Sequence, residues 1–407
     1  MPATRSSEPS LLRHKPFARF WLARMLSTIA FQAQAVAVGW QVYALTGSAI
    51  YLGLVGLAQF LPMFFLTLVV GHVADRYDRR VIAAACQAAE AVAAGVLAAG
   101  SSGGWLDSRG VLAVVFFIGT ARAFEMPSMH ALVPNLVPQP LIPRAAAWSS
   151  SASQTATILG PALGGFLYVA GPGTAYAVAA SLFLGAAGLV SMIRIERVPP
   201  RREPATVRSL FAGISFIRSR PEILGAITLD LFAVLLGGAT ALLPVYARDI
   251  LATGPWGLGL LRSAPAAGAL AMSVFLARRP LRRRVGRTMF VAVGVFGAAT
   301  VVFALSRSFA LSLGALATLG AADVISVVVR FSLVQIGTPD EMRGRVSAVN
   351  AMFVGTSNQL GEFESGVTAA LFGTVPAVLI GGVGTIVVAV LWARFFPGLY
   401  RVDTLEK

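Results

Sequence analysis

The sequence predicts an all-α integral membrane protein whose twelve transmembrane helices form two pseudo-symmetric six-helix bundles. Hydrophobic residues make up 56% of the 407 residues and charged residues only 13%, whereas a water-soluble domain carries roughly 25% charged residues. Long apolar runs follow one another along the chain, and twelve helices of roughly 20–25 residues account for most of a chain of this length. The two halves of the sequence also share a sparse repeat.

Each apolar run is expected to be a helix, because backbone inside hydrocarbon must satisfy its hydrogen bonds within its own segment. The runs span residues 17–45, 49–74, 80–100, 110–133, 144–170, 173–193, 221–249, 256–278, 287–306, 308–337, 346–373 and 375–396. The first run is too long for the core of a secretory signal peptide, so we expect it to be retained as a helix.

The basic residues predict the orientation of the chain in the membrane. If the N-terminus is cytoplasmic, the inside segments hold 26 arginines and lysines and the outside loops hold 3. Because cytoplasmic loops carry the excess of such residues, we expect both termini in the cytoplasm and the protein in the inner membrane of a bacterium. The net charge is +15, but the charges form no basic stripe with interleaved aromatics, so we expect no nucleic-acid partner.

A repeat divides the chain into an N-terminal half (1–193), a cytoplasmic linker (194–220) and a C-terminal half (221–407). A shift of 201 positions brings Pro138, Arg144, Ala147, Leu159, Gly160 and Gly165 onto Pro339, Arg345, Ala348, Leu360, Gly361 and Gly366. Two parallel six-helix halves place a binding site at their interface. The linker carries an apolar face that we expect to lie on the membrane surface. That face consists of Leu210, Phe211, Ile214, Phe216 and Ile217.

The loop between the second and third helices reads GHVADRYDRR, from Gly71 to Arg80. It resembles the signature loop of the major facilitator superfamily, as does the twelve-helix organisation. Two further segments resemble the enterobactin-exporter-like branch of the drug:proton antiporters within that superfamily. They are Ser209-Leu210 with Gly213 and Phe216, and Thr338-Pro339 with Met342, Gly344 and Arg345. The resemblance implies a secondary active transporter that works by alternating access.

In such a transporter the signature loop forms a cytoplasmic gate. The residues that the resemblance assigns to this gate are Gly71, Asp75, Arg76, Arg79 and Arg80. Asp75 is suited to a helix N-terminus, where the macrodipole favours an anion, and the arginines are able to pair with it or with Asp78. Arg79 and Arg80 are equally well explained by the excess of positive charge at the cytoplasmic side.

The fifth helix contains a glycine motif that resembles the one associated with proton-driven exporters. Its members are Gly160, Pro161, Gly164 and Gly165. Gly160 and Gly164 share one helix face and allow close helix contact, and Pro161 favours a kink. The longer form of the motif has a glycine where this chain has Ala156. Ordinary glycine-mediated packing is the alternative interpretation.

Ionisable residues inside the predicted helices are the candidate functional residues, because each costs about 3 kcal/mol at the bilayer centre on insertion scales. They are Arg24, Glu90, Arg122, Glu125, Asp230, Arg262, Asp323, Arg330, Glu362 and Glu364. Arg122 and Glu125 are three residues apart and are expected to pair. Glu362 and Glu364 cannot face the same way on one helix. Arg24 and Arg262 lie nearer helix ends, where arginines snorkel to the membrane surface.

The resemblance implies that helices one, four, seven and ten line a central cavity. We expect Glu125, Asp230, Asp323 or Glu362 to carry protons, and Arg122 and Arg330 to tune these carboxylates or to meet an anionic substrate. Arg24 and Gln32 share a stripe on the first helix, and Glu364 is a further candidate. Structural ion pairs between helices are the alternative role for each of these residues.

The predicted function is proton-coupled export of small amphipathic organic molecules of the siderophore or drug type. Import and lipid or lysophospholipid translocation are the alternatives. An enzyme is disfavoured because the three histidines lie far apart and no hydrolase, metalloprotease or phosphate-binding motif is present. A membrane receptor that does not transport is also disfavoured, because such a protein would not need carboxylates on several of its helices. We expect a monomer without a cofactor, whose partners are the lipid bilayer, the small-molecule substrate and protons.

Overall fold

The computed structural model describes residues 11–194 and 207–404, and every regular element in this part of the chain is helical. The α-helices are α1 (Lys15–Thr46), α2 (Ala49–Arg76), α3 (Arg79–Ser102), α4 (Ser108–Leu132), α5 (Ile142–Val169), α6 (Pro172–Ser191), α7 (Val207–Ser219), α8 (Pro221–Leu236), α9 (Leu243–Val245), α10 (Gly254–Arg278), α11 (Val285–Leu305), α12 (Phe309–Gly337), α13 (Asp340–Phe372), α14 (Thr374–Phe395) and α15 (Pro397–Tyr400). Each of the twelve predicted transmembrane segments corresponds to a helix or, for the seventh, to an interrupted helix.

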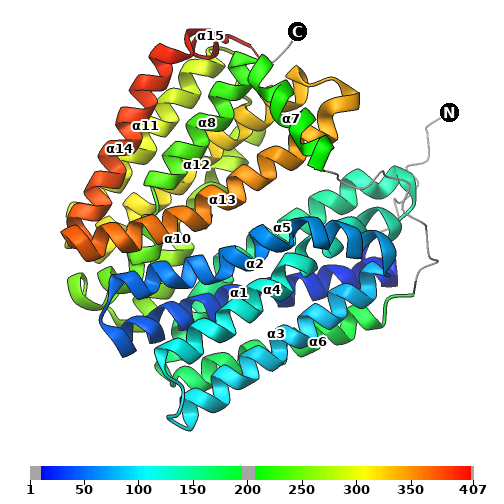
Figure 1. The fold of residues 1–407 in the computed structure, drawn as a ribbon, viewed down its shortest axis with the longest axis vertical. Helices are drawn as coiled ribbons and strands as arrows, with labels where there is room; N and C mark the ends of the chain where they lie inside the picture. The colour runs from blue at the N-terminus through cyan, green and yellow to red at the C-terminus, as the bar shows by residue number, and fades with distance from the viewer. Residues whose placement is uncertain (1–10, 195–206, 405–407) are drawn as a thin grey trace, which may run out of the picture.

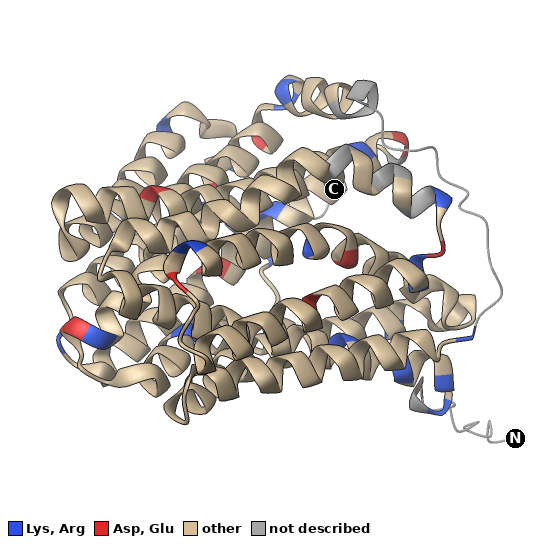
Figure 2. Cartoon of the chain, turned by 60° about the horizontal axis from the view of Figure 1, so that its bottom comes forward, with Lys and Arg blue, Asp and Glu red and all other residues tan. Residues whose placement is uncertain are grey.

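Nine of the segments within residues 11–194 and 207–404 are both long and apolar enough to cross a membrane. Three others, α1, α5 and α13, are long enough at 32, 28 and 33 residues but carry more polar side chains. Figure 2 shows that charged residues gather toward the helix ends, with a few in the middle of the molecule. Polar residues in long membrane helices face protein or water rather than lipid, so these three helices are expected to line the interior.

The seventh transmembrane segment is interrupted at Gly237 and Gly238. α8 ends at Leu236, and the segment continues through the short helix η4 (Ala239–Leu242), α9 and the π-helix η5 (Tyr246–Ile250). The two glycines therefore mark a break in the helix. A Cβ atom at Gly238 would lie only 2.3 Å from the carbonyl oxygen of Gly361 on α13. Such irregular backbone is tolerated within the membrane where protein surrounds it.

The helices pack in two groups, which we call the first bundle (α1–α6) and the second bundle (α8–α15). In the first bundle α1 packs on α5 and α6, and α3 packs on α4 and α6; in the second, α10 and α11 pack on α12, and α8 packs on α13 and α14. The bundles contact each other through α5 with α10 and α2 with α13. Figure 1 shows the ribbons meeting at one end of the molecule and diverging toward the side of the N-terminus.

Glycines at the end remote from the termini permit the contact between the bundles. Gly165 near the end of α5 lies against Gly259 near the start of α10: a Cβ atom at Gly165 would lie 2.9 Å from the Cα atom of Gly259. Gly53 on α2 and Gly366 on α13 approach in the same way, with 2.6 Å between a Cβ atom at Gly366 and the Cα atom of Gly53. Small residues let membrane helices approach this closely.

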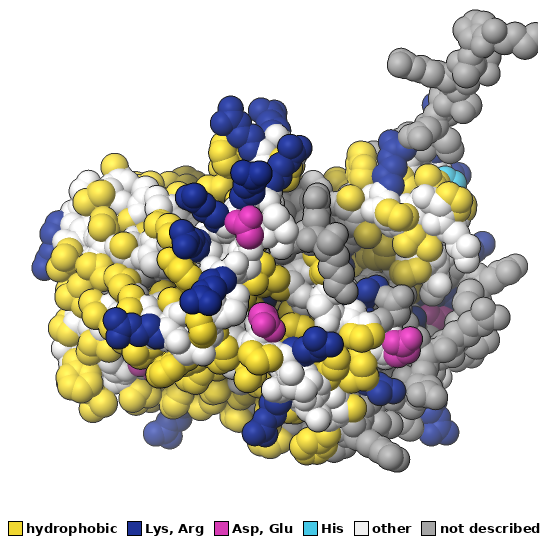
Figure 3. Space-filling view, turned by 90° about the horizontal axis from the view of Figure 1, so that it is seen from above, with side chains coloured by type: hydrophobic (Ala, Val, Ile, Leu, Met, Phe, Trp, Pro, Cys, Tyr) yellow, Lys and Arg dark blue, Asp and Glu magenta, His cyan; other side chains and the backbone are white. Residues whose placement is uncertain are grey.

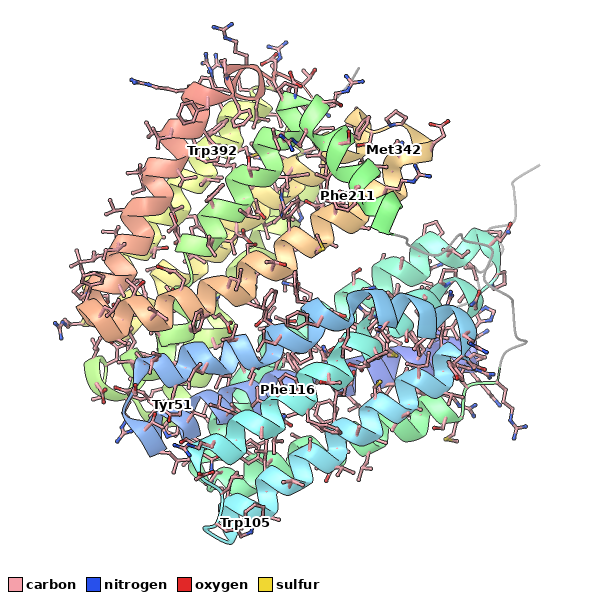
Figure 4. All side chains as sticks on the ribbon, viewed as in Figure 1. Tyr51, Trp105, Phe116, Phe211, Met342 and Trp392 are labelled. Atoms are coloured by element: carbon pink, nitrogen blue, oxygen red, sulfur yellow. The ribbon has the colours of Figure 1, made fainter. Side chains whose placement is uncertain are left out.

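The helix α7 packs on the second bundle with part of the apolar face that we expected to lie on the membrane. Ile217 is 2% exposed and belongs to a cluster with Val346 and Val349 of α13, while Phe211 remains 65% exposed. Figure 4 shows Phe211 on α7 and Met342 near the start of α13 at the same end of the molecule. The side chain of Leu210, and residues 195–206 of the predicted linker, lie outside the described part of the chain.

Alanine at Gly164 is expected to destabilise the protein. A Cβ atom at this position would lie 2.4 Å from the backbone oxygen of Ala33 on α1, and overpacking of this kind costs roughly 1–3 kcal/mol. That cost exceeds the gain of about 1 kcal/mol that alanine brings to a helix interior. The matched control is Gly188→Ala on α6, where nothing lies within 4 Å of a Cβ atom. Unfolding free energies in mild detergent should fall for G164A alone; equal values for the two variants would contradict the packing argument.

Candidate functional site

The first bundle holds a buried ion pair between Arg122 and Glu125, one turn apart on α4. Nη1 of Arg122 donates to Oε2 of Glu125, and Nε2 of Gln87 on α3 donates to the other carboxylate oxygen at 2.9 Å. The Arg122 guanidinium also lies over the ring of Phe31 on α1, 4.4 Å from its centroid. Cation–π and charge-assisted contacts of this kind fix the direction of both charged groups.

This pair borders a polar cavity of about 190 Å³ between α1, α4 and α5. The charged and hydrogen-bonding residues that line it include Arg24, Thr28, Arg122, Glu125, His130, Ser153 and Thr157. Nε of Arg24 donates to Oγ of Ser153 at 2.7 Å, and its Nη2 lies 3.4 Å from Nε2 of His130. Arg24, for which we considered snorkelling to the surface, is thus held inside the bundle by these partners.

Glu90 on α3 is a fully buried carboxyl group beside the same pair. Its exposed fraction is 0%, and neither of its side-chain oxygens has a hydrogen-bond partner among the described residues. Within the same part of the chain, the side-chain oxygen of Gln87, one turn earlier on α3, is also without a donor. Burial of a carboxyl group without a partner is costly.

The second bundle contains a corresponding ion pair between Asp230 of α8 and Arg330 of α12. Oδ2 of Asp230 lies 3.2 Å from Nη2 of Arg330, and the two side chains are 5% and 6% exposed. Nη1 of Arg330 donates to Oδ1 of Asn350 on α13 at 3.0 Å. Asp323, two turns before Arg330, lines a small cavity together with Asp230. The partners of Arg330 thus lie on two other helices, α8 and α13.

Glu362 lies at the contact between the bundles, apart from the second ion pair. Its Oε2 would be 2.9 Å from a Cβ atom at Gly56 of α2, so the glycine makes room for the carboxylate. Arg262 of α10 reaches into the same interface, where its Nη1 would be 3.9 Å from a Cβ atom at Gly39 of α1. Part of the Arg262 guanidinium thus lies near α1. Glu364 accepts a hydrogen bond from Thr368 on its own helix at 2.7 Å.

Several described residues of the loop between α2 and α3 make contacts within the first bundle. Asp78 caps α3 by accepting from the backbone N–H of Arg80, and pairs with the Arg80 guanidinium at 2.5 Å. Arg80 also donates to the carbonyl of Ile193 at 2.9 Å, and Arg79 to that of Ala131 at 3.4 Å. Arg76 is exposed. The surroundings of Gly71 and the side chain of Asp75 lie outside what the structure describes.

The glycine motif of α5 lies against two helices. A Cβ atom at Gly160 would lie 2.6 Å from Cβ of Gln32 on α1, so Gln32 packs between α1 and α5. Gly164 lies against Ala33 of the same helix, whereas Gly165 faces α10. α5 continues through Pro161, whose carbonyl would be 2.5 Å from a Cβ atom at Gly259. The motif therefore joins α1 and α10 to α5.

Comparison with known proteins assigns the family. Residues 6–403 match the family described as transmembrane secretion effector, of the major facilitator superfamily. The chain belongs to this family. Because the family is one of transporters, its members are not enzymes.

Two relatives of this family member are enterobactin exporters. The chain is 27% identical over 416 residues to the enterobactin exporter EntS of Citrobacter koseri, covering 96% of this chain and 94% of that protein. It is 26% identical over 406 residues to EntS of Escherichia coli O127:H6, covering 94% and 92%. The whole length of the chain is therefore similar to these exporters.

Solved structures share the fold of this transporter at low sequence identity. A mutant of the nucleoside transporter NupG superposes with a TM-score of 0.74 at 12% identity, covering 94% of this chain and all of that one. A bacterial homologue of the human lysosomal transporter Spinster gives 0.74 at 14% identity, covering 96% and 97%. A bacterial homologue of the iron transporter ferroportin gives 0.67 at 18%, covering 94% and 99%. These likenesses establish the fold.

Sequence reasoning missed three partners of the charged residues in this transporter. Those partners are Gln87, His130 and Asn350. Each lies within a predicted transmembrane segment, where any polar side chain needs a partner. Extending the search from ionisable residues to every amide, imidazole and hydroxyl in these segments would have found them, among others.

Proposed function

We propose that this secondary transporter is a proton-coupled exporter of small amphipathic organic molecules of the siderophore type. The cavity of the first bundle carries the proposal: Arg24, Arg122 and His130 line it with the single carboxylate of Glu125. Arginines facing a cavity favour a substrate with anionic or hydrogen-bond-accepting oxygens. The relatives named as enterobactin exporters support the same substrate type and direction of transport.

Alternating access is proposed to occur by movement of the N-terminal half (1–193) against the C-terminal half (221–407), with 194–220 as the linker. The bundles meet at the end remote from the termini, which we propose is the outer side, with both termini in the cytoplasm. Closure of the other end is then assigned to the loop that contains Gly71, Asp75 and the three arginines. The unit of transport is proposed to be a monomer.

Proton transfer is assigned to the buried carboxylates, with Glu125 as the first choice. Glu125 borders the cavity, pairs with the Arg122 guanidinium and accepts a hydrogen bond from Gln87. Loss or gain of a proton on Glu125 therefore changes the pairing of Arg122. Asp230 stands in the same relation to Arg330. Asp323 lies beside Asp230, and Glu362 lies at the interface, where its charge changes as the bundles separate.

The experiment is transport of enterobactin into proteoliposomes loaded with a pH-sensitive dye. An imposed enterobactin gradient should drive protons in the opposite direction, and protein-free liposomes should show no pH change. Enterobactin movement without a pH change would refute proton coupling, and proton movement in the same direction would indicate an importer. A response to lysophospholipid alone would favour the lipid translocator.

Replacing Arg24 with glutamine should lower the apparent affinity of the transporter for enterobactin in this assay. The change removes a charged hydrogen-bond donor from the cavity, an interaction worth roughly 1.5–3 kcal/mol, so KM for enterobactin should rise about tenfold or more. Arg19→Gln is the matched control, because Arg19 lies on the same helix but donates to the carbonyl of Met192 at 2.5 Å, outside the cavity. A common rise of KM in both variants would count against the cavity as the substrate site.

A further inference from the structure

A second cavity, of about 270 Å³, lies at the end of the second bundle where the C-terminal segment crosses the start of α11. It is lined by Arg284, Arg287, Tyr400, Arg401, Val402 and Asp403. Three guanidinium groups thus share one hollow with a single carboxylate. This cavity is distinct from the clusters around Arg122 and Arg330, so the function proposed above does not use it.

The backbone of the C-terminal segment builds this cavity. The N–H of Gly286 donates to the carbonyl of Val402 at 2.9 Å, and the N–H of Arg284 donates to Oδ1 of Asp403 at 3.0 Å. A Cβ atom at Gly286 would lie 2.1 Å from the carbonyl oxygen of Leu399, so only glycine lets the segment lie this close to α11. Because these contacts already occupy the first N–H groups of α11 and one oxygen of Asp403, a ligand is left with the arginine side chains.

The charge of the cavity favours an anion. The Arg287 guanidinium lies 5.3 Å from the centroid of the Tyr400 ring, which limits its freedom. Figure 3 shows arginine or lysine side chains gathered over this face of the molecule. Nearby arginines of the chain are Arg278, Arg279, Arg282, Arg283 and Arg394. Planar guanidinium groups match phosphate oxygens in a bidentate geometry.

An apolar surface continues from the cavity along α11. Arg287, Val291 and Val295 follow at spacings of four and therefore lie on one face of the helix. Val291 and Val295 are 64% and 40% exposed, and Phe395 at the end of the neighbouring α14 is 68% exposed. A free phosphate ion has no apolar part that could contact this face. A phospholipid can place its headgroup on the arginines and its acyl chain along the valines.

We propose that this cavity is a specific binding site for the headgroup of an anionic phospholipid. The phosphodiester contacts Arg284, Arg287 and Arg401, and an acyl chain follows the exposed face of α11. Because the C-terminal segment forms one wall of the site, the bound lipid links that segment to α11 and stabilises this end of the second bundle.

The test is lipid binding by the full chain purified in a neutral detergent. Native mass spectrometry and thermal unfolding are followed while phosphatidylglycerol, phosphatidylcholine or inorganic phosphate is added. Phosphatidylglycerol should be retained and should raise the unfolding temperature more than the other two. For R287Q/R401Q its apparent Kd should rise about tenfold or more, while R282Q/R283Q, which loses the same charge from the adjoining turn, should keep the wild-type Kd.

Several outcomes overturn the proposal. Equal retention of phosphatidylglycerol and phosphatidylcholine by the wild-type protein removes the anionic selectivity, without reference to any variant. Equal stabilisation by inorganic phosphate reassigns the cavity to a free anion. Equal weakening in the two double variants reduces the effect to the overall positive charge of this face. R287K/R401K, which keeps the charge but not the planar fork, serves as the folding control if R287Q/R401Q is unstable.

Discussion

Replacing Arg330 with methionine is expected to lower the free energy of unfolding by about 3–5 kcal/mol, because it leaves a buried carboxylate without its cation. Asp230 lies 3.2 Å from the Arg330 guanidinium, and both side chains are nearly inaccessible. The variant also removes the donor to Asn350. Reversible unfolding of the purified protein in mild detergent measures the effect.

The double variant Asp230→Asn with Arg330→Met provides the internal control. If the loss arises from the unpaired charge of Asp230, neutralising Asp230 in the R330M background should recover most of it, as replacement of both partners of a buried pair is often close to neutral. Arg282→Met, at an exposed position, should change the unfolding free energy by no more than about 0.5 kcal/mol. A double variant less stable than R330M would mean that Arg330 stabilises the bundle through packing rather than charge.

The fold was predictable because hydropathy reports directly on where a chain crosses a membrane. Backbone in hydrocarbon has no alternative to a helix, so the twelve apolar runs indicated the twelve segments. The largest error is at α13, which begins at Asp340 rather than at 346. Its first turns are charged and precede the apolar run, and acidic residues are favourable at a helix start, so hydropathy alone places the start of this helix too late.

The candidate site was predictable within single helices and much less so between them. Arg122 and Glu125 pair as the spacing of three indicates, because that geometry is a property of the helix itself. The contact of Arg24 with Ser153 depends on how neighbouring helices are rotated and shifted along their axes. No local pattern in one sequence fixes these quantities, so this contact was not predictable from the sequence of α1 alone.

Glutamine at position 125 is expected to abolish proton-coupled transport while leaving substrate exchange intact. The amide has the shape of the carboxyl group and can still accept a hydrogen bond from Gln87, but it cannot release a proton. Uptake driven by a pH gradient should fall at least about a hundredfold, in the range typical for loss of a proton-transferring side chain. Counterflow of enterobactin between equal concentrations requires no net proton movement, so it should persist and show that E125Q is folded.

Glu90→Gln is the matched comparison, since it makes the same chemical change one helix away. Glu90 is fully buried, does not line the cavity and has no hydrogen-bond partner for either oxygen in the part of the chain that the structure describes. Glutamine has nearly the same size and shape as glutamic acid, so E90Q should retain gradient-driven transport. The reverse result, with coupling lost in E90Q and kept in E125Q, would move the proton from the cavity wall to α3. In that case the ion pair of Arg122 and Glu125 would be structural, and the unpartnered oxygens of Gln87 and Glu90 would mark the proton's path.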